Sequence, residues 1–205
     1  MALAASKPRP KRTPLVCVVA IGASAGGING LLQLLPDLPL IPHVCLLIVV
    51  HLDPRSKSFL PHILGRAAHW QVKQAEEGEL LRAGVAYIAP PDFHLVLEGG
   101  RLHLSSSGPV QMHRPSVDVL FESLAKQKYL QKHLKMIAVL LSGSGRDGSE
   151  GLRSMKLSGA STIVQDPADS MFPSMPEHGI ETGCADFVMP ARSIAPKISM
   201  LCAQG

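Results

Sequence analysis

The chain has 205 residues, of which 46% are hydrophobic and 18% are charged, and these proportions suit one globular domain with a full core. Its net charge is +4, but residues 1–14 hold four basic and no acidic side chains, so 16 basic residues face 16 acidic ones in the remainder. A body without net charge argues against a basic nucleic-acid-binding face. A membrane-spanning helix needs roughly 18 uncharged apolar residues, and the only such stretch is broken by a glycine cluster, so we predict no membrane span.

Residues 1–14 contain three prolines and four cationic side chains, a composition typical of a disordered basic tail. We therefore expect a single ordered domain over residues 15–205. The four cysteines show no C-x-x-C spacing, which favours free thiols in a reducing, cytoplasmic setting. No His, Cys, Asp or Glu residues have metal-ligand spacing either, and we expect no metal and no other cofactor.

Apolar runs and helical periodicities alternate along the first half of this domain. Residues 15–21 and 44–50 are unbroken apolar runs, typical of parallel strands that are buried on both faces. Apolar residues at helical spacing follow each run, from 28 to 35 and from 59 to 67. A third buried strand is predicted over residues 85–89.

The second half begins with residues 94–105, whose alternation about a Gly-Gly pair predicts a hairpin grafted onto the sheet. Strands and helices then continue to alternate, with a helix from Ser116, a strand over 136–141, a helix that Ser149 caps and Gly159 ends, and a strand over 160–165. Two further helices are predicted over 175–182 and 194–202, on either side of a short apolar segment at 187–189. This order predicts an α/β fold, a doubly wound and mainly parallel sheet flanked by helices, with a small antiparallel hairpin.

The turn between the first strand and the first helix, GASAGG at 22–27, fits the G-x-S-x-G pattern of a nucleophile elbow. Such a turn raises the hydroxyl of Ser24 above the sheet, and free N–H groups at the start of the helix face any negative charge that forms there. Three other interpretations remain open, namely a phosphate-binding loop, a signal-peptide cleavage site and a tight turn without chemistry.

Polar side chains follow three of the predicted strands. Ser24 follows the first strand, His51 follows the second, and Asp147 follows the strand over 136–141 in a glycine-rich loop. The carboxyl ends of parallel strands meet at one edge of the sheet, where ligands bind. A serine nucleophile needs a neighbouring base, and that base needs a carboxylate to orient it. The sequence therefore predicts a Ser24, His51 and Asp147 triad.

Other residues compete for these roles. His94 also lies beyond a strand end, but it begins the predicted hairpin, and we favour His51 as the base. Asp53 is close to His51 in sequence, whereas Asp166 and Asp169 follow a strand in a segment that favours a turn. The chain order Ser, His, Asp differs from the Ser, Asp, His order of the α/β-hydrolases, so the elbow alone does not place the chain in that class.

Six sequence blocks in one order resemble the chemotaxis-type protein-glutamate methylesterases, the CheB catalytic domains. They are IGASAGG at 21–27, VVHLDP at 49–54, YIAPPDFHL at 87–95, RPSVDVLF at 114–121, LLSGSGRDGSEG at 140–151 and QDPADSMFPSMP at 165–176. The resemblance covers nearly all of residues 18–198, and it places the family's serine, histidine and aspartate on Ser24, His51 and Asp147. It implies hydrolysis of glutamate γ-methyl esters on the cytoplasmic domain of a chemoreceptor, with glutamine deamidation in some members.

The chain departs from the family pattern at two positions beside the triad. Family members often carry threonine after the serine and methionine between the glycines of the aspartate loop, where this chain has Ala25 and Ser144. Both positions border the expected oxyanion and substrate site, which we assign to Ala25, Gly26, Gly27, Ser144 and Gly145.

The resemblance also leads to an expectation about regulation, and two alternative functions remain open. Members with a chemotaxis role usually carry an amino-terminal receiver domain, and only 23 residues precede Ser24 here. We therefore expect no receiver domain, an activity indifferent to small-molecule phosphodonors, and control by a separate regulatory or methyltransferase partner. The alternatives are a phosphate- or nucleotide-binding module that uses the loop at 22–27 without turnover, and a serine esterase acting on another ester.

Overall fold

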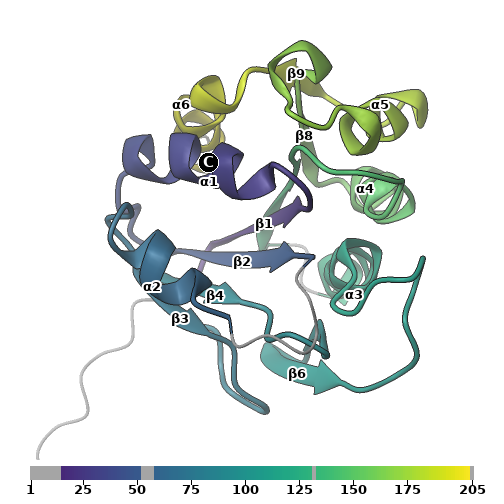
Figure 1. Cartoon of the computed structure of the whole chain (residues 1–205). Coiled ribbons are helices and arrows are strands. Elements are labelled where there is room, and N and C mark those ends of the chain that lie inside the picture. The colour runs from purple at the N-terminus through teal and green to yellow at the C-terminus, as the bar shows by residue number, and fades with distance from the viewer. Residues whose placement is uncertain (1–14, 52–57, 131–132, 204–205) are drawn as a thin grey trace, which may run out of the picture.

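The computed structural model describes residues 15–51, 58–130 and 133–203, so the predicted tail at 1–14 lies outside the described residues. Its main feature is a seven-stranded parallel sheet in the order β3-β4-β2-β1-β7-β8-β9 (Figure 1). The strands of this sheet are β1 (Cys17–Ala23), β2 (Val44–Val50), β3 (Gln71–Gln74), β4 (Val85–Ile88), β7 (Lys135–Leu140), β8 (Ser161–Gln165) and β9 (Phe187–Met189). The predicted doubly wound, parallel α/β fold is confirmed.

Helices cover both faces of the sheet (Figure 1). They are α1 (Gly27–Leu34), α2 (Leu60–Gly65), α3 (Val117–Leu130), α4 (Ser149–Leu157), α5 (Ser174–Glu181) and α6 (Ala191–Ala203), with 3-10 turns η1 (Leu35–Asp37) and η2 (Pro167–Asp169). One apolar core lies between the sheet and α1, α2 and α6, and a second lies between the sheet and α3, α4 and α5. Within the described residues, no helix is both long and apolar enough to cross a membrane.

The strand β1 lies at the centre of the sheet, between β2 and β7, where the order of the strands reverses. The register pairs Ala23 with Val50, so β1 and β2 end side by side. Backbone hydrogen bonds just beyond the strand ends hold the loops after β1, β2 and β7 together. His51 N donates to Ala23 O at 3.2 Å, and Ser24 N donates to Ser142 O at 3.0 Å. In open α/β sheets this reversal point at the carboxyl ends is where ligands bind.

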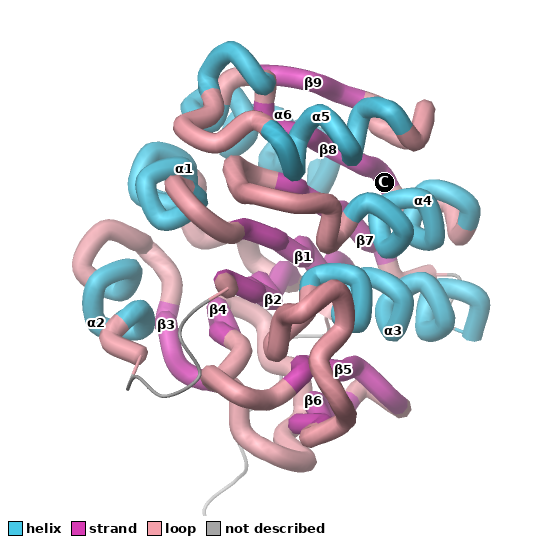
Figure 2. The backbone as a smooth tube through the Cα atoms, turned by 45° about the vertical axis from the view of Figure 1, so that its right-hand side comes forward, coloured by secondary structure: helices cyan, strands magenta, loops and turns pink. Residues whose placement is uncertain are grey.

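The predicted hairpin is formed by β5 (His94–Glu98) and β6 (Arg101–Ser105), but it makes a separate two-stranded sheet. It lies next to α3 (Figure 2). Its apolar face, which includes Leu95 and Leu97, belongs to the core under α3, and Leu97 N donates to Ser123 Oγ of that helix at 3.1 Å. The expectation that the hairpin is grafted onto the main sheet is therefore wrong, because its strands bury their side chains against a helix instead of extending the ladder.

Two strand assignments also differ from the sequence-based expectation. The first strand spans Cys17–Ala23 and not residues 15–21, since Gly22 and Ala23 stay in register with β2. The sequence does not predict β3, because Gln71–Gln74 is largely polar and lies at the edge of the sheet with two of its side chains exposed. Short polar edge strands lack the apolar signal that marks central strands.

The predicted cap of α4 is wrong. Ser149 is the first residue of that helix, the N-cap is Gly148, and the buried Ser149 Oγ has no hydrogen-bond partner among the described residues. Asp118 of α3 supplies the cap instead, because its Oδ1 accepts the N–H groups of Gly148 at 2.8 Å and Gly151 at 2.7 Å. Gly159 follows the end of α4, as predicted.

Candidate active site

A buried histidine and a buried aspartate meet at the carboxyl edge of the sheet. His51 directly follows β2, and Asp147 lies in the loop between β7 and α4. The distance from His51 Nε2 to Asp147 Oδ2 is 2.7 Å, and the two side chains are 6% and 0% exposed. The structure thus brings together the predicted base and its predicted orienting carboxylate.

Asp147 is held by three donors at the beginning of α3 and by His51. Its Oδ1 accepts from the Ser116 hydroxyl at 2.8 Å and from Asp118 N at 2.9 Å, and its Oδ2 accepts from Val117 N at 2.8 Å as well as from His51. Burial pushes the pKa of Asp147 upward, but the hydrogen bonds from His51 and the backbone outweigh this effect and hold the pKa below its ordinary value. Asp147 is therefore ionised, and from a distant loop its carboxylate caps the first N–H groups of α3 as well as pairing with His51.

Asp118 and Asp147 cap each other's neighbouring helix. Asp118, which belongs to α3, accepts N–H groups at the start of α4, and Asp147, which precedes α4, accepts N–H groups at the start of α3. Burial raises the pKa of Asp118 to about 7, opposed by the N–H donor of Gly151 and reinforced by the charge of Asp147. This reciprocal capping fixes the position of the carboxylate that faces His51.

The hydrogen bond to Asp147 also selects the tautomer of His51. With Nε2–H directed at the carboxylate, Nδ1 is the unprotonated, basic nitrogen. Nδ1 is buried and has no hydrogen-bond partner among the described residues. Ser24 is half-buried and directly follows Ala23, whose carbonyl accepts from His51 N, but its hydroxyl makes no hydrogen bond to Nδ1 in this structure. A serine nucleophile needs an unprotonated nitrogen on a neighbouring base, and the adjoining strand ends that carry Ser24 and His51 supply the two groups.

The loop after Ser24 has two kinds of backbone N–H group. Gly27 N donates to Ser24 O at 2.9 Å, so it already has an acceptor. The N–H groups of Ala25 and Gly26 donate to no described residue, and Gly26 adopts a left-handed conformation (φ 72°) as the N-cap of α1. Of the three predicted oxyanion donors in this loop, Ala25 and Gly26 are the two that remain available.

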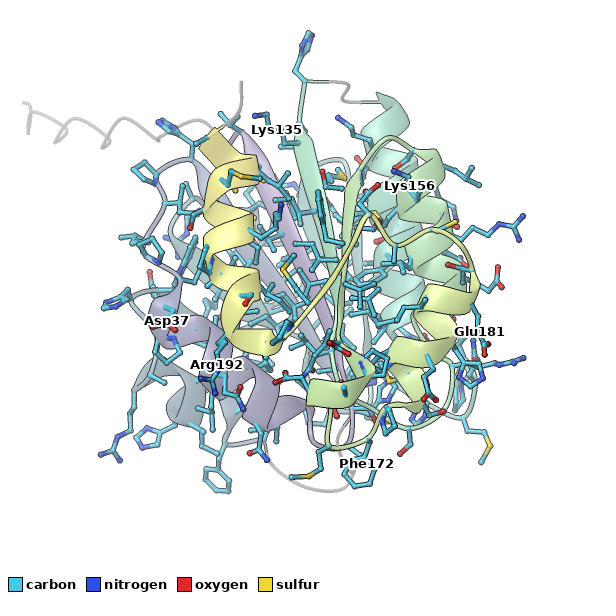
Figure 3. The ribbon with its side chains drawn as sticks, turned by 90° about the horizontal axis from the view of Figure 1, so that it is seen from above. Asp37, Lys135, Lys156, Phe172, Glu181 and Arg192 are labelled. Atoms are coloured by element: carbon cyan, nitrogen blue, oxygen red, sulfur yellow. The ribbon has the colours of Figure 1, made fainter. Side chains whose placement is uncertain are left out.

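The loop after β7 approaches the loop that carries Ser24 closely, which was not apparent from the sequence. A Cβ added to Gly143 would lie 2.7 Å from Ser24 Cβ and 2.1 Å from Met175 Sδ, so only glycine fits there. Gly143 N donates to Phe172 O at 2.9 Å, and Phe172 lies at the end of the molecule opposite Lys135 of β7 (Figure 3). Ser144 and Gly145, the two other predicted oxyanion residues, follow Gly143 and are exposed.

The competing residues have other partners. His94 is fully buried, with Nδ1 accepting from Ser116 N at 3.1 Å and Nε2 at 3.1 Å from Gly108 O, so both ring nitrogens are occupied. Asp166 caps η2, and Asp169 Oδ2 accepts from Ala191 N at 2.9 Å. Asp53 lies outside the described residues. The part of the chain that the structure describes holds no group of three or more His, Cys, Asp or Glu side chains suited to a metal ion.

A second histidine, which the sequence does not single out, lies against the candidate base. The ring of His113 stacks on the ring of His51 with centroids 3.7 Å apart and an interplanar angle of 6°. Both rings line a pocket of about 220 Å³ that also contains Met112 and Arg114. Sequence periodicity carries no signal for this contact, because His113 lies in an irregular loop.

These features define a parallel α/β protein with a candidate Ser-His-Asp site at the central strand ends of its sheet. The chain belongs to the CheB methylesterase family, whose model matches residues 19–198. The resemblance inferred from the six sequence blocks is therefore confirmed.

Individual relatives agree with this assignment. A putative protein-glutamate methylesterase/protein-glutamine glutaminase from Leptospira interrogans is 38% identical over 178 residues, which are 86% of this chain and 90% of the relative. The protein of the corresponding name from Geobacillus kaustophilus is 39% identical over 193 residues, but this chain spans only 54% of its length. The crystal structure of the Thermotoga maritima CheB methylesterase catalytic domain matches with a TM-score of 0.81 and 34% identity, covering 90% of this chain and 97% of that one.

Proposed function

We propose that this chain hydrolyses glutamate γ-methyl esters on the cytoplasmic domain of chemoreceptors, releasing methanol, and that the same site deamidates receptor glutamines. The observation that carries the proposal is the buried pair of His51 and Asp147 at the strand end adjoining that of Ser24, with no hydrogen-bond partner for Nδ1 of the base among the described residues. The names of the relatives join the two activities, and both reactions proceed by attack on the same side-chain carbonyl carbon. A cytoplasmic location follows from this substrate.

Acyl transfer through Ser24 accounts for each of these groups. As Ser24 Oγ attacks the ester carbonyl, its proton passes to His51 Nδ1, and the ionised Asp147 stabilises the resulting imidazolium. His51 then gives this proton to the departing methoxide, so methanol leaves and a glutamyl ester of Ser24 remains. A water molecule deprotonated by His51 hydrolyses that ester and restores the free serine. In deamidation the same proton assists the departure of ammonia.

The negative oxygen of the tetrahedral intermediate needs donors that are not already in use. Ala25 N and Gly26 N meet this condition at the start of α1, where the helix dipole also favours negative charge. Ser144 and Gly145 belong to the loop that Gly143 brings against Ser24. We assign the oxyanion site to these two backbone segments.

The proposal is tested by measuring methanol release from a methylated receptor cytoplasmic fragment, and ammonia release from a fragment with glutamine at the methylation site. Ser24→Ala should lower both rates by about a thousandfold or more, because triad members act as a unit. Ser193→Ala is a matched control, since Ser193 is exposed on α6. Near wild-type turnover by Ser24→Ala would refute the nucleophile. A wild-type protein that hydrolyses simple esters but not the receptor would favour a different ester substrate.

A further inference from the structure

The loop between β6 and α3 brings His113 onto the face of the candidate base. The two rings are 3.7 Å apart and nearly parallel, which is full contact of one imidazole face with the other. His51 has one hydrogen bond through its ring, from Nε2 to Asp147, and Nδ1 has none among the described residues. A single hydrogen bond fixes one point of the ring but not its plane. The stacked His113 ring supplies the second constraint.

The segment that carries His113 is held in a costly conformation. Val110 and His113 exchange two backbone hydrogen bonds, of 3.1 and 2.9 Å, around a tight turn. The two central residues, Gln111 and Met112, have φ values of 48° and 67°, which residues other than glycine seldom adopt. Such strain persists only where the surroundings impose it, and it gathers at functional sites.

Anchors on both sides of the turn impose this conformation. Gln111 Nε2 donates to Asp118 Oδ2 at 2.7 Å, so the turn is attached to the aspartate that caps α4. Arg114 Nε donates to Asp92 Oδ1 at 2.9 Å, and Arg114 Nη1 donates to Ser106 O at 3.0 Å. The side chain of Met112 at the tip of the turn is 93% exposed, so apolar burial of that residue does not explain the turn. The anchored turn places the ring of His113 against the ring of His51.

We propose that His113 is a positioning residue for the base, whose ring face holds His51 with Nε2 toward Asp147 and Nδ1 toward Ser24. The proposal rests on the proposed function, in which Nδ1 accepts the serine proton. It also gives the stack a role during turnover. When His51 becomes an imidazolium, an uncharged aromatic face at van der Waals distance attracts the cation.

The charge state of His113 suits this role. Burial lowers the pKa of His113, and the neighbouring His51 lowers it further, while Asp147 acts in the opposite direction. Arg114 and Asp92 line the same pocket, and their charges are paired with each other. His113 is therefore uncharged at neutral pH, and its ring does not repel a protonated His51.

Substitutions that keep or remove the ring separate positioning from a general structural role. A desolvated cation–aromatic contact is worth roughly 1–2 kcal/mol, so His113→Ala should lower kcat for methanol release about tenfold, with little change in KM. His113→Phe keeps an aromatic face without ring nitrogens, and it should restore kcat to within about threefold of wild type. His103→Ala is the control, because His103 lies on β6 and pairs with Glu77.

The outcomes that would overturn the proposal are an unchanged kcat in His113→Ala, an effect confined to KM, and equal losses in His113→Ala and His113→Phe. Thermal melting of each variant shows which proteins are folded, and only folded variants are compared. Equal losses would indicate a chemical role for the ring nitrogens instead of a role for the aromatic face.

A spectroscopic measurement tests the same idea without any turnover. In 15N-resolved NMR spectra of the histidine rings, His51 should show a proton on Nε2 and carbon-bound ring protons shifted upfield by the stacked ring. His113→Ala should remove the upfield shift and mix the tautomers, whereas His113→Phe should retain both signatures. Retention of both in His113→Ala would overturn the proposal. A wild-type protein with these signatures but without methanol release would contradict the proposed function and not the stack.

Discussion

Removal of the Asp147 carboxylate should damage both the fold and the site, unlike removal of the Ser24 hydroxyl. In Asp147→Ala, three donors in addition to His51 lose their acceptor, namely the Ser116 hydroxyl and the N–H groups of Val117 and Asp118. All of them are buried at the start of α3. The carboxylate therefore supports a helix terminus as well as a base.

The size of the effect follows from these contacts. Loss of the N-cap costs about 1 kcal/mol, and loss of a buried negative charge at the helix terminus adds roughly 1–2 kcal/mol. The unpaired hydroxyl and imidazole each add about 1 kcal/mol. We expect Asp147→Ala to lose about 4–5 kcal/mol of unfolding free energy, or roughly 8–20 °C in Tm for a protein of this size. Asp147→Asn should fall between wild type and Ala, because its amide keeps one oxygen but directs N–H groups at donors.

Urea and thermal unfolding measure this loss, and methanol release measures the activity of the folded fraction. Asp37→Ala is the matched control, since Asp37 is exposed in η1, and it should leave both quantities unchanged. Ser24→Ala should unfold like the wild type while losing activity. An Asp147→Ala protein as stable as the wild type would refute the capping role, whatever its activity.

Three further predictions concern other residues of the site. Gly143→Ala should lower both thermal stability and methanol release, because its new Cβ would overlap Met175 Sδ. Gly108→Ala is the control, since the space around Gly108 is open, and melting and turnover assays should show no change in it. The raised pKa of Asp118, about 7 against roughly 3.9 in an unfolded chain, means that the folded state binds an extra proton between these values. Its contribution to stability should be full below about pH 4 and should be lost as the pH rises to about 7; urea titrations should show a shallower pH dependence in Asp118→Asn. His94→Ala should lower Tm, because a buried, doubly bonded ring is lost, yet keep substantial hydrolysis per folded molecule; an inactive but folded variant would mean that His94 has a direct role.

The three candidate residues could be selected from the sequence because each of them follows a buried strand. An apolar run such as 44–50 indicates a strand of a parallel sheet, and its end determines where His51 must lie. The same reasoning places Ser24 after β1 and Asp147 after β7. The pairing of His51 with Asp147 then follows from the topology, since β2 and β7 flank β1.

What the sequence could not indicate depends on contacts between distant segments. Asp118 gives no sign that it caps α4, since a helix cap is normally sought next to the helix in sequence. The stacking of His113 depends on a strained turn with Gln111 and Met112 at positions where glycine or asparagine is expected. The sequence also does not show that the Gly27 N–H is already used, because its bond to Ser24 O depends on the conformation of the turn. These features decide the geometry of the site, although they leave no periodic pattern.

The central claim is that Ser24 and His51 act as one chemical unit, and a double-mutant cycle tests it most directly. The measurement is kcat/KM for methanol release from a methylated receptor fragment by wild type, Ser24→Ala, His51→Ala and the double variant. We predict that each single variant loses about a thousandfold or more and that the double variant is no slower than the slower single one. Losses that multiply in the double variant, or a Ser24→Ala protein that keeps its activity, would contradict the account.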